Sequence, residues 1–286
     1  MLKRYLIIAV VLIMGLMAGV IQGGCAAEET TTRIKVVTTT SLMEQIALRV
    51  GGDMVDVVNI IPPAQCPGHF DVKPGDVQKL ADADLFLMHG WQGEMFSDEL
   101  IASADNPDLT TSVINAKVGE NVNWMTPSVQ ADAVDKIAEA LSGVDAANSE
   151  AYRELADEYK AEIEVKEAEI LALLADKELG NVNIMCNEQL TGLVRWLGLN
   201  VVTTYGRPDS LTPQVVKDFV DTAKAEDVVL FIDNLQAGAE AAVQMAEEVG
   251  CKRIVFTNFP GGFEGTETWE KAIDYDIDIL LEAISE

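Results

Sequence analysis

The chain has 286 residues, of which 49% are hydrophobic, and a formal net charge of −27. That length suits two medium domains or one large one. Because 47 acidic residues outnumber 20 basic ones, the composition argues against nucleic acid as a partner, since phosphates need clustered Lys and Arg. We interpret the acidic excess as a solvated surface.

A basic start and an apolar run open the chain. Lys3 and Arg4 precede the apolar stretch 5–21, and "QGGC" then ends at Cys25. This order predicts a signal segment over residues 1–25. Small residues before a Cys resemble the lipobox of bacterial-type lipoproteins, with Gln22 where an aliphatic residue is usual, so Cys25 is the predicted lipidation site. A plain cleaved signal or an uncleaved anchor helix stays open. In each case we expect the rest of the chain to lie outside the cytoplasm. With the lipid anchor, which is the favoured interpretation, the protein is held at the membrane surface through the polar tether 26–32.

Short apolar runs alternate with helical stretches along the rest of the chain. The runs cover residues 34–38, 55–61, 84–88 and 112–114 in the first half and 182–185, 201–205, 228–233 and 253–257 in the second. Continuous apolar runs such as "VVLFID" are typical of strands buried on both faces of a parallel sheet. Helical stretches such as 127–141 and 212–225 complete a βα rhythm. We therefore predict an α/β fold with two lobes of four strands each, over residues 33–148 and 181–286.

The segment 149–180 between the lobes contains no Gly or Pro before Gly180. Its larger apolar residues, among them Tyr152, Tyr159 and Ile163, follow helical spacing. The pattern predicts one helix of roughly 30 residues, on the order of 45 Å long. A single bridging helix would limit hinge motion, so we expect small local rearrangements on ligand binding.

Ligands of parallel α/β sheets bind outside the carboxyl ends of the strands. Cys66 and His69, in "AQCPGHFD", follow the second predicted strand, and His89 follows the third. Cys186 and Asp233 lie at the ends of strands in the second half. A Cys-x-x-His pair alone is a weak metal-binding signal, so its meaning depends on the fold around it.

From "IKVVTTTSLMEQIALRVGGDMVDVVNIIPP" through "DVQKLADADLFLMHGWQGE" to "ILLEAI", the chain resembles the solute-binding proteins of zinc and manganese ABC importers. The resemblance implies two α/β lobes with parallel sheets, joined by one long rigid helix. It also implies that a divalent metal ion is bound between the lobes and delivered to a membrane permease that works with an ATPase.

The resemblance also implies four metal-ligand positions, and only one of them keeps its residue. His69 fits the first His of the family. Val122 stands where the second His is expected, although Trp124 and Pro127 around it match. Asn187 and Asn258 stand at the third and fourth positions, where the family has His or Glu and Asp. The family's hard-cation site is therefore not reproduced.

Two thiols lie near these altered positions. Cys66 is three residues before His69, and Cys186 directly precedes Asn187. Two thiolates and an imidazole suit a soft or borderline, zinc-like metal ion. We therefore predict that Cys66, His69, Cys186 and Asp233 hold the transported metal. Further candidate ligand-binding residues are His89, Trp124, Asn123, Asn187, Arg207 and Asn258.

Other interpretations of the same residues stay open. Cys66 and Cys186 could form a disulfide, which is permitted outside the cytoplasm, or could pack inertly, the role we expect for Cys251. Arg207 at the cleft, with neutral Asn side chains where charges were expected, also fits a metal chelate or an anionic organic solute.

No enzyme signature is present in the sequence. It contains no Ser nucleophile elbow, no glycine-rich phosphate loop and no His-Glu-x-x-His pattern. A Cys–His dyad would lack a clear orienting partner. We therefore expect a monomeric binding protein without catalytic activity, whose partners are the permease, its ATPase and the membrane.

Overall fold

The computed structural model describes residues 33–91, 94–117 and 122–285. The predicted signal segment, Cys25 and the tether lie outside the described residues. In the described part of the chain, no helix combines the length and the hydrophobicity that a membrane crossing requires.

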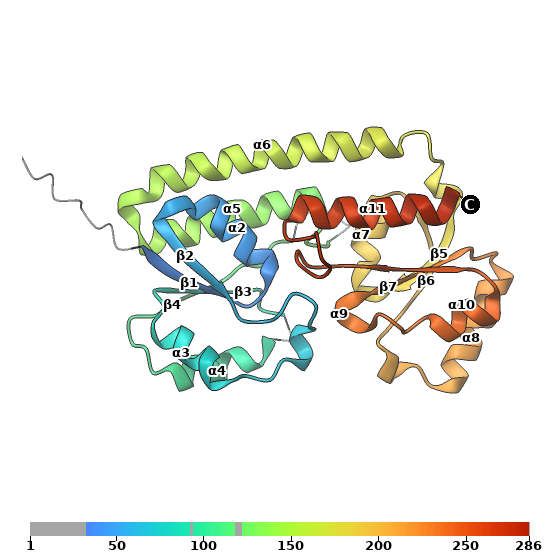
Figure 1. Cartoon of the computed structure of the whole chain (residues 1–286), viewed down its shortest axis with the longest axis horizontal. Coiled ribbons are helices and arrows are strands. Elements are labelled where there is room, and N and C mark those ends of the chain that lie inside the picture. The colour runs from blue at the N-terminus through green and yellow to red at the C-terminus, as the bar shows by residue number, and fades with distance from the viewer. Residues whose placement is uncertain (1–32, 92–93, 118–121, 286) are drawn as a thin grey trace, which may run out of the picture. The chain divides into compact units, whose positions relative to one another are not determined.

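Two parallel four-stranded sheets form the framework, which confirms the predicted fold class (Figure 1). The first sheet has the order β2-β1-β3-β4 and the second has the order β6-β5-β7-β8. Their strands are β1 (Ile34–Thr38), β2 (Val55–Asn59), β3 (Leu85–Met88), β4 (Thr110–Val113), β5 (Asn183–Asn187), β6 (Asn200–Tyr205), β7 (Leu230–Asn234) and β8 (Lys252–Phe256). All five residues of β7 are buried, as the continuous apolar run predicts for a strand inside a parallel sheet.

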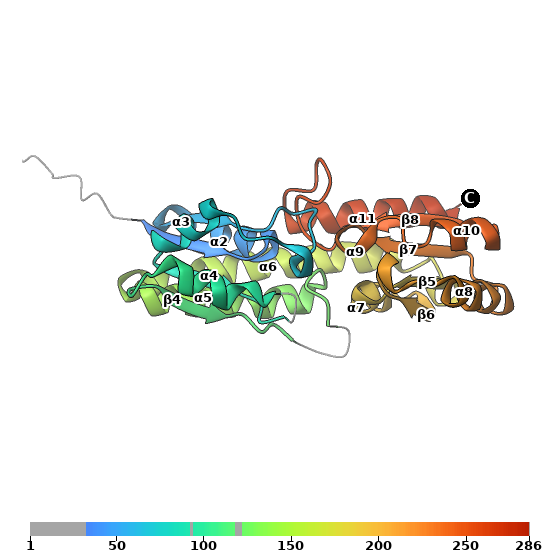
Figure 2. The ribbon, with the colours of Figure 1, turned by 90° about the horizontal axis from the view of Figure 1, so that it is seen from below.

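Helices flank the sheets, and Figure 2 shows them from a second side. The first half contains α2 (Ser41–Gly51), α3 (Pro74–Ala81), α4 (Phe96–Ala104) and α5 (Pro127–Val144). The second half contains α7 (Thr191–Trp196), α8 (Pro213–Ala225), α9 (Leu235–Gly238), α10 (Val243–Val249) and α11 (Trp269–Ser285). Three of them, α3, α5 and α8, begin with Pro, which is tolerated in the first turn because its missing N–H has no intrahelical acceptor there.

The long helix α6 (Ser149–Leu174) passes beside both sheets (Figure 1). Its 26 residues span about 39 Å at about 1.5 Å per residue. It is shorter than the roughly 30 residues that composition predicts, because the chain turns after Leu174 and Glu178 adopts a left-handed backbone conformation with φ 47°. The buried face of α6 includes Tyr152, Tyr159 and Ile163, which confirms the helical spacing of its apolar residues.

One continuous apolar core joins the two halves. The same buried cluster contains Val36 from β1, Ile163 from α6 and Ile232 from β7. Within it, the indole Nε1 of Trp269 on α11 donates a hydrogen bond to the carbonyl oxygen of Met125, at 3.0 Å. The carboxyl ends of both sheets are therefore positioned by shared packing as well as by the helix that connects them.

The contribution of α6 to stability can be tested with two neighbouring positions. Ile163 is 1% exposed and Val165 is 60% exposed. We expect Ile163→Ala to lower the free energy of unfolding by about 2–5 kcal/mol, because it leaves a cavity in the shared core. Val165→Ala should change it by less than about 0.5 kcal/mol. Urea unfolding of both variants gives the comparison, and equal effects would contradict the assignment of the buried face.

Candidate ligand-binding site

A pocket of about 340 Å³ lies where loops at the carboxyl ends of both sheets meet. This is the position at which parallel α/β folds bind their ligands. The pocket is lined by Cys66, Pro67, Gly68, Trp91, Ala116, Lys117, Val122, Asn123, Trp124, Gln189, Arg207, Gln236, Asn258 and Phe259. Five of the ten predicted site residues therefore line one pocket, namely Cys66, Asn123, Trp124, Arg207 and Asn258, as does Val122 from the second ligand position of the family.

Cys66 and His69 lie together because a single 3₁₀ turn, Pro67–His69, follows Cys66. The backbone N–H of His69 donates to the carbonyl oxygen of Cys66 at 3.1 Å, which closes this turn. Cys66 is buried, whereas His69 is exposed at the rim. The predicted proximity of the two side chains is therefore present in the structure.

Arg207, which follows β6, reaches both of these side chains. Its Nη2 donates to the sulfur of Cys66, and its Nη1 lies 3.3 Å from Nδ1 and 3.1 Å from Nε2 of His69. A Cβ atom on Gly68 would lie 3.2 Å from Nη2, so the absence of a side chain there allows the close approach. A guanidinium has only donors, so the sulfur and the imidazole face it as acceptors.

The charged side chains of the described pocket lining are both positive. Arg207 and Lys117 contribute them, and no Asp or Glu occurs among the lining residues within 33–91, 94–117 and 122–285. This contrasts with the chain as a whole, whose formal net charge is −27. At short range, these two cationic side chains favour an anion over a cation.

Neutral amides form the part of the lining where charged ligands were expected. Asn123 Nδ2 donates to Asn258 Oδ1 and to the carbonyl oxygen of Gln189, both at 2.9 Å. The Asn258 N–H donates to Gln236 Oε1 at 2.9 Å, and Gln236 Nε2 donates to the carbonyl oxygen of Pro63 at 2.8 Å. Three of these four bonds link loops of the first sheet to loops of the second across the site, and the bond between Asn258 and Gln236 joins two loops of the second half.

His89 lies behind the lining and is 1% exposed. Its Nε2 is 2.6 Å from Thr40 Oγ1, and its ring stacks on Trp91 and meets Trp124 edge-on, with centroid distances of 3.7 and 4.2 Å. Burial lowers the pKa of His89 well below its usual value, so the imidazole is neutral. Its Nδ1 has no hydrogen-bond partner among the described residues.

Cys186 and Asp233 are held elsewhere by other contacts. Cys186 on β5 is 0% exposed within the shared core, and burial raises the pKa of its thiol to about 12. Asp233 on β7 accepts hydrogen bonds from Tyr205 Oη at 2.8 Å and from Arg253 Nη1 at 2.7 Å. Asn187 is also buried, and its Oδ1 accepts the N–H of Gln189 at 3.1 Å, which is a local turn contact.

The structure does not bring the four predicted metal ligands together. Across residues 33–91, 94–117 and 122–285, no three His, Cys, Asp or Glu side chains are grouped so that they could hold a metal ion. Cys66 and Cys186 are both free thiols, so the alternative of a disulfide between them is wrong for this structure. Cys186 is instead a core residue, and Cys251 packs against a smaller apolar cluster as expected.

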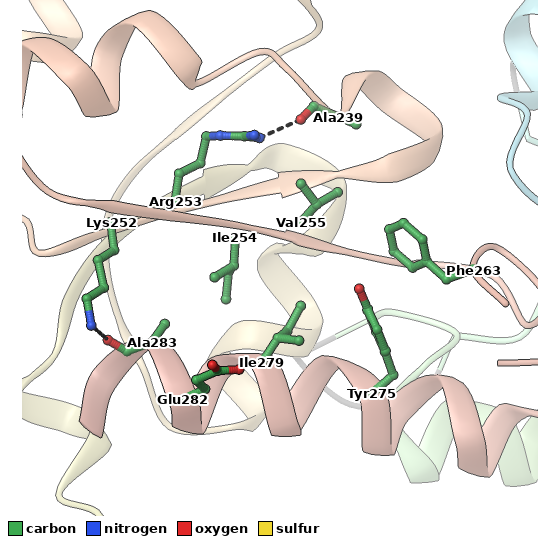
Figure 3. A pocket seen from close by; sticks show the side chains of 10 residues that line it. All are labelled: Ala239, Lys252, Arg253, Ile254, Val255, Phe263, Tyr275, Ile279, Glu282 and Ala283. Atoms are coloured by element: carbon green, nitrogen blue, oxygen red, sulfur yellow. Dashed lines mark hydrogen bonds between the residues drawn. The ribbon is translucent and has the colours of Figure 1, made fainter. Parts of the chain in front are cut away.

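A second cavity, of about 550 Å³, lies between β8 and α11 (Figure 3). Its basic side chains already have acceptors: Arg253 Nη1 donates to the carbonyl oxygen of Ala239, and Lys252 Nζ donates to that of Ala283 at 2.8 Å. None of the predicted site residues lines this cavity. The loops at the strand ends therefore remain the candidate site.

Several residues of the site have no distinctive sequence signal. Lys117, Gln189 and Gln236 occur in polar stretches without a motif, and only the fold shows that they line the pocket. Trp91 and Phe259 each lie three residues after the end of a strand, β3 and β8, in loops where a ligand was expected. Their positions after strands are the one sequence feature that could have identified them.

Comparisons with known proteins agree with this architecture. The family model for zinc-uptake complex component A periplasmic, ZnuA, matches residues 36–283. The iron-binding protein YfeA of Yersinia pestis is 21% identical over 277 residues, which cover 90% of this chain and 88% of YfeA. The manganese ABC transporter substrate-binding lipoprotein PsaA of Streptococcus pneumoniae is 32% identical over 125 residues, which cover 42% of this chain and 37% of PsaA.

Solved structures share the fold at low sequence identity. The substrate-binding protein FpvC of Pseudomonas aeruginosa, in complex with Mn²⁺, has a TM-score of 0.77 and 22% identity, covering 89% of this chain and 99% of FpvC. A crystal structure of ZnuA has a TM-score of 0.73 and 18% identity, covering 88% of this chain and 99% of that one. Because the family model spans most of the sequence, the chain belongs to the ZnuA family of periplasmic substrate-binding proteins of metal ABC importers.

Proposed function

We propose that this substrate-binding protein captures its metal as an anionic chelate and delivers the chelate to the importer's permease. The family supports a metal as the transported element. The observation that favours a chelate is the guanidinium of Arg207, which contacts both Cys66 and His69. A positive charge thus stands beside the two side chains that would otherwise be the best ligands for a bare cation.

The repulsion between this guanidinium and a bare ion would be large. Two unit charges 4 Å apart interact by roughly 4 kcal/mol at an effective dielectric constant of 20, and a divalent ion would double that figure. In relatives that bind bare ions, ligand charges must offset the charge of the metal. Here the lining residues that the structure describes include Arg207 and Lys117 but no carboxylate, which supports a negatively charged ligand.

The size of the pocket supports the same proposal. Its volume of about 340 Å³ lies at the lower end of the roughly 300–1,000 Å³ that is typical of small-molecule sites. A metal ion held by side chains needs no such space, because its ligands close around it. The neutral amides of Asn123 and Asn258 suit hydrogen bonding to an organic ligand.

A bare zinc-like ion at Cys66, His69, Cys186 and Asp233 is the competing proposal. It would require Arg207 to withdraw, Cys186 to ionise inside the apolar core, and Asp233 to leave Tyr205 and Arg253. Removing one member of a buried charge pair typically costs 3–5 kcal/mol. The chelate needs none of these changes.

The remaining parts of the proposal concern the membrane and the partners. We propose that Cys25 carries the lipid anchor, that residues 26–32 act as the tether, and that the protein works as a monomer with an ABC permease and its ATPase. The lobe boundaries proposed from the sequence place the bridge at residues 149–180. The shared core favours release by local loop movement over wide hinge closure.

Native mass spectrometry of the full-length chain from its own cells tests the chelate proposal. We expect a bound species heavier than a bare ion, containing both a metal and an organic anion. Arg207→Gln should weaken its binding by about tenfold or more, because hydrogen bonds to charged groups contribute about 1.5–3 kcal/mol. Arg153→Gln makes the same charge change on the exposed side of α6 and should have no effect. A bare metal ion, bound equally well by the Arg207→Gln variant, would contradict the proposal.

Thiol labelling tests the competing metal site. With a pKa of about 12, roughly one Cys186 thiol in ten thousand is ionised at pH 8, and the side chain is also buried. We expect iodoacetamide to leave Cys186 unmodified in the folded protein, whether or not metal chelators are present, and to modify it after unfolding. Peptide mapping reads out the modification, with half-buried Cys251 as an internal comparison. Rapid modification of Cys186 after metal removal would support the thiolate site instead.

A further inference from the structure

Three aromatic side chains form one corner of the ligand pocket. We call Trp91, Trp124 and Phe259 the aromatic corner, and all three line the pocket. The rings of Trp91 and Phe259 are nearly parallel, with an interplanar angle of 18° and centroids 6.4 Å apart. The ring of Trp124 is nearly perpendicular to that of Trp91, at 88° and 6.3 Å. The three rings of the corner are therefore packed in two orientations.

The aromatic corner is held by contacts behind it. His89 stacks on Trp91 with an interplanar angle of 8°, and it meets Trp124 at 81°. Directly before Trp91, the N–H of Gly90 donates to Glu94 Oε2 at 2.7 Å. Glu94 is 5% exposed and also accepts a hydrogen bond from Thr39. The ring of Trp91 is therefore positioned before any ligand arrives, which lowers the entropy lost on binding.

Trp91 differs from the other two rings in its exposure. Trp124 and Phe259 are 5% and 3% exposed, so most of their surface is already covered by protein. Trp91 is only half-buried, although it lies among other aromatic rings at the centre of the site. A large apolar ring left partly open beside two cationic side chains can be covered by the apolar part of an anionic ligand.

We infer that the anion bound here carries an aromatic ring, which stacks on Trp91 in the aromatic corner while its oxygen atoms face Arg207 and Lys117. This inference rests on the proposed function, because it specifies the organic part of the proposed chelate. The ligand class is an aryl carboxylate or a catecholate, whose oxygen atoms can bind both a metal ion and a guanidinium. Ring stacking supplies binding that a purely aliphatic chelate cannot obtain from this lining.

Other ligand chemistries fit the lining less well. An organic cation could occupy an aromatic corner through cation–π attraction, but Arg207 and Lys117 would repel it, and no described lining residue is a carboxylate that would compensate. An aliphatic polycarboxylate would satisfy the two cations, yet it would leave the face of Trp91 partly hydrated. An aromatic anion can pair its charge with Arg207 and Lys117 and also cover the face of Trp91.

Equilibrium dialysis of the full-length chain in detergent tests the inference with three probes: ferric 2,3-dihydroxybenzoate, ferric citrate and zinc chloride. We expect the aromatic chelate to bind about tenfold more tightly than ferric citrate. Trp91→Leu should remove this preference and leave the affinity for ferric citrate within about twofold. Trp91→Phe, which retains an aromatic ring, should keep most of the preference for the aromatic chelate. Trp196→Leu, on α7 and outside the pocket lining, is the matched control and should change neither affinity.

The outcomes separate the inference from the proposed function. If both ferric chelates bind with equal affinity, or if Trp91→Leu weakens both alike, the aromatic inference is overturned while the anionic site stands. If zinc chloride binds and neither chelate does, both proposals fail. Thermal unfolding of each variant shows whether it remains folded, and the comparison of Trp91→Phe with Trp91→Leu identifies the ring itself as the cause.

Discussion

The shared apolar core is the constraint on which the binding site depends. Loops from two separate sheets can form one pocket only if the sheets keep a fixed relation, and here buried residues from both belong to a single cluster. Trp269 adds a directional contact to this packing, because its indole N–H reaches the backbone at Met125, directly after the pocket residue Trp124. The site therefore lies on packing that both halves share, unlike a cleft between domains that each have a separate core.

The distribution of charge gives the pocket its chemical character. The protein as a whole is strongly acidic, so at long range it repels anions. Salt at physiological concentration screens exposed charges beyond about 8 Å, which leaves the local cations of the pocket to act at short range. Arg207 is suited to this role because its planar guanidinium contacts the sulfur of Cys66 and the ring of His69 at once.

The fold could be predicted from the sequence because it depends on patterns that extend over many residues. Alternating apolar runs indicated the eight strands, and the absence of Gly and Pro indicated α6. The site was only partly predictable, because it depends on the direction of single side chains. Successive residues of a strand point to opposite faces, so the adjacent Cys186 and Asn187 cannot both face one ligand. The sequence does not show which face of β5 is buried against the shared core.

The partner of Asp233 is set by the arrangement of strands in the second sheet. Its carboxylate is bonded to Arg253 on the neighbouring strand β8, and that pairing depends on the order and register of strands β7 and β8. Likewise, Arg207 could be recognised as a cleft residue, but its contacts with Cys66 and His69 join positions 141 and 138 residues apart in the chain. Such partners are set by tertiary structure, for which a single sequence carries no local signal.

The hydrogen bonds that cross the site have a consequence for the kinetics of transport. Ser41 Oγ donates to the carbonyl oxygen of Pro260 at 2.7 Å, and the bonds from Asn123 and Gln236 also join loops of opposite halves. Each such bond contributes about 1 kcal/mol net, so opening several together slows ligand exit many-fold. A permease that offers its own donors and acceptors to these loops could replace the bonds one at a time. The loop contacts would then keep ligand dissociation slow while the protein is free, and ligand release would become fast only when the protein docks on the permease.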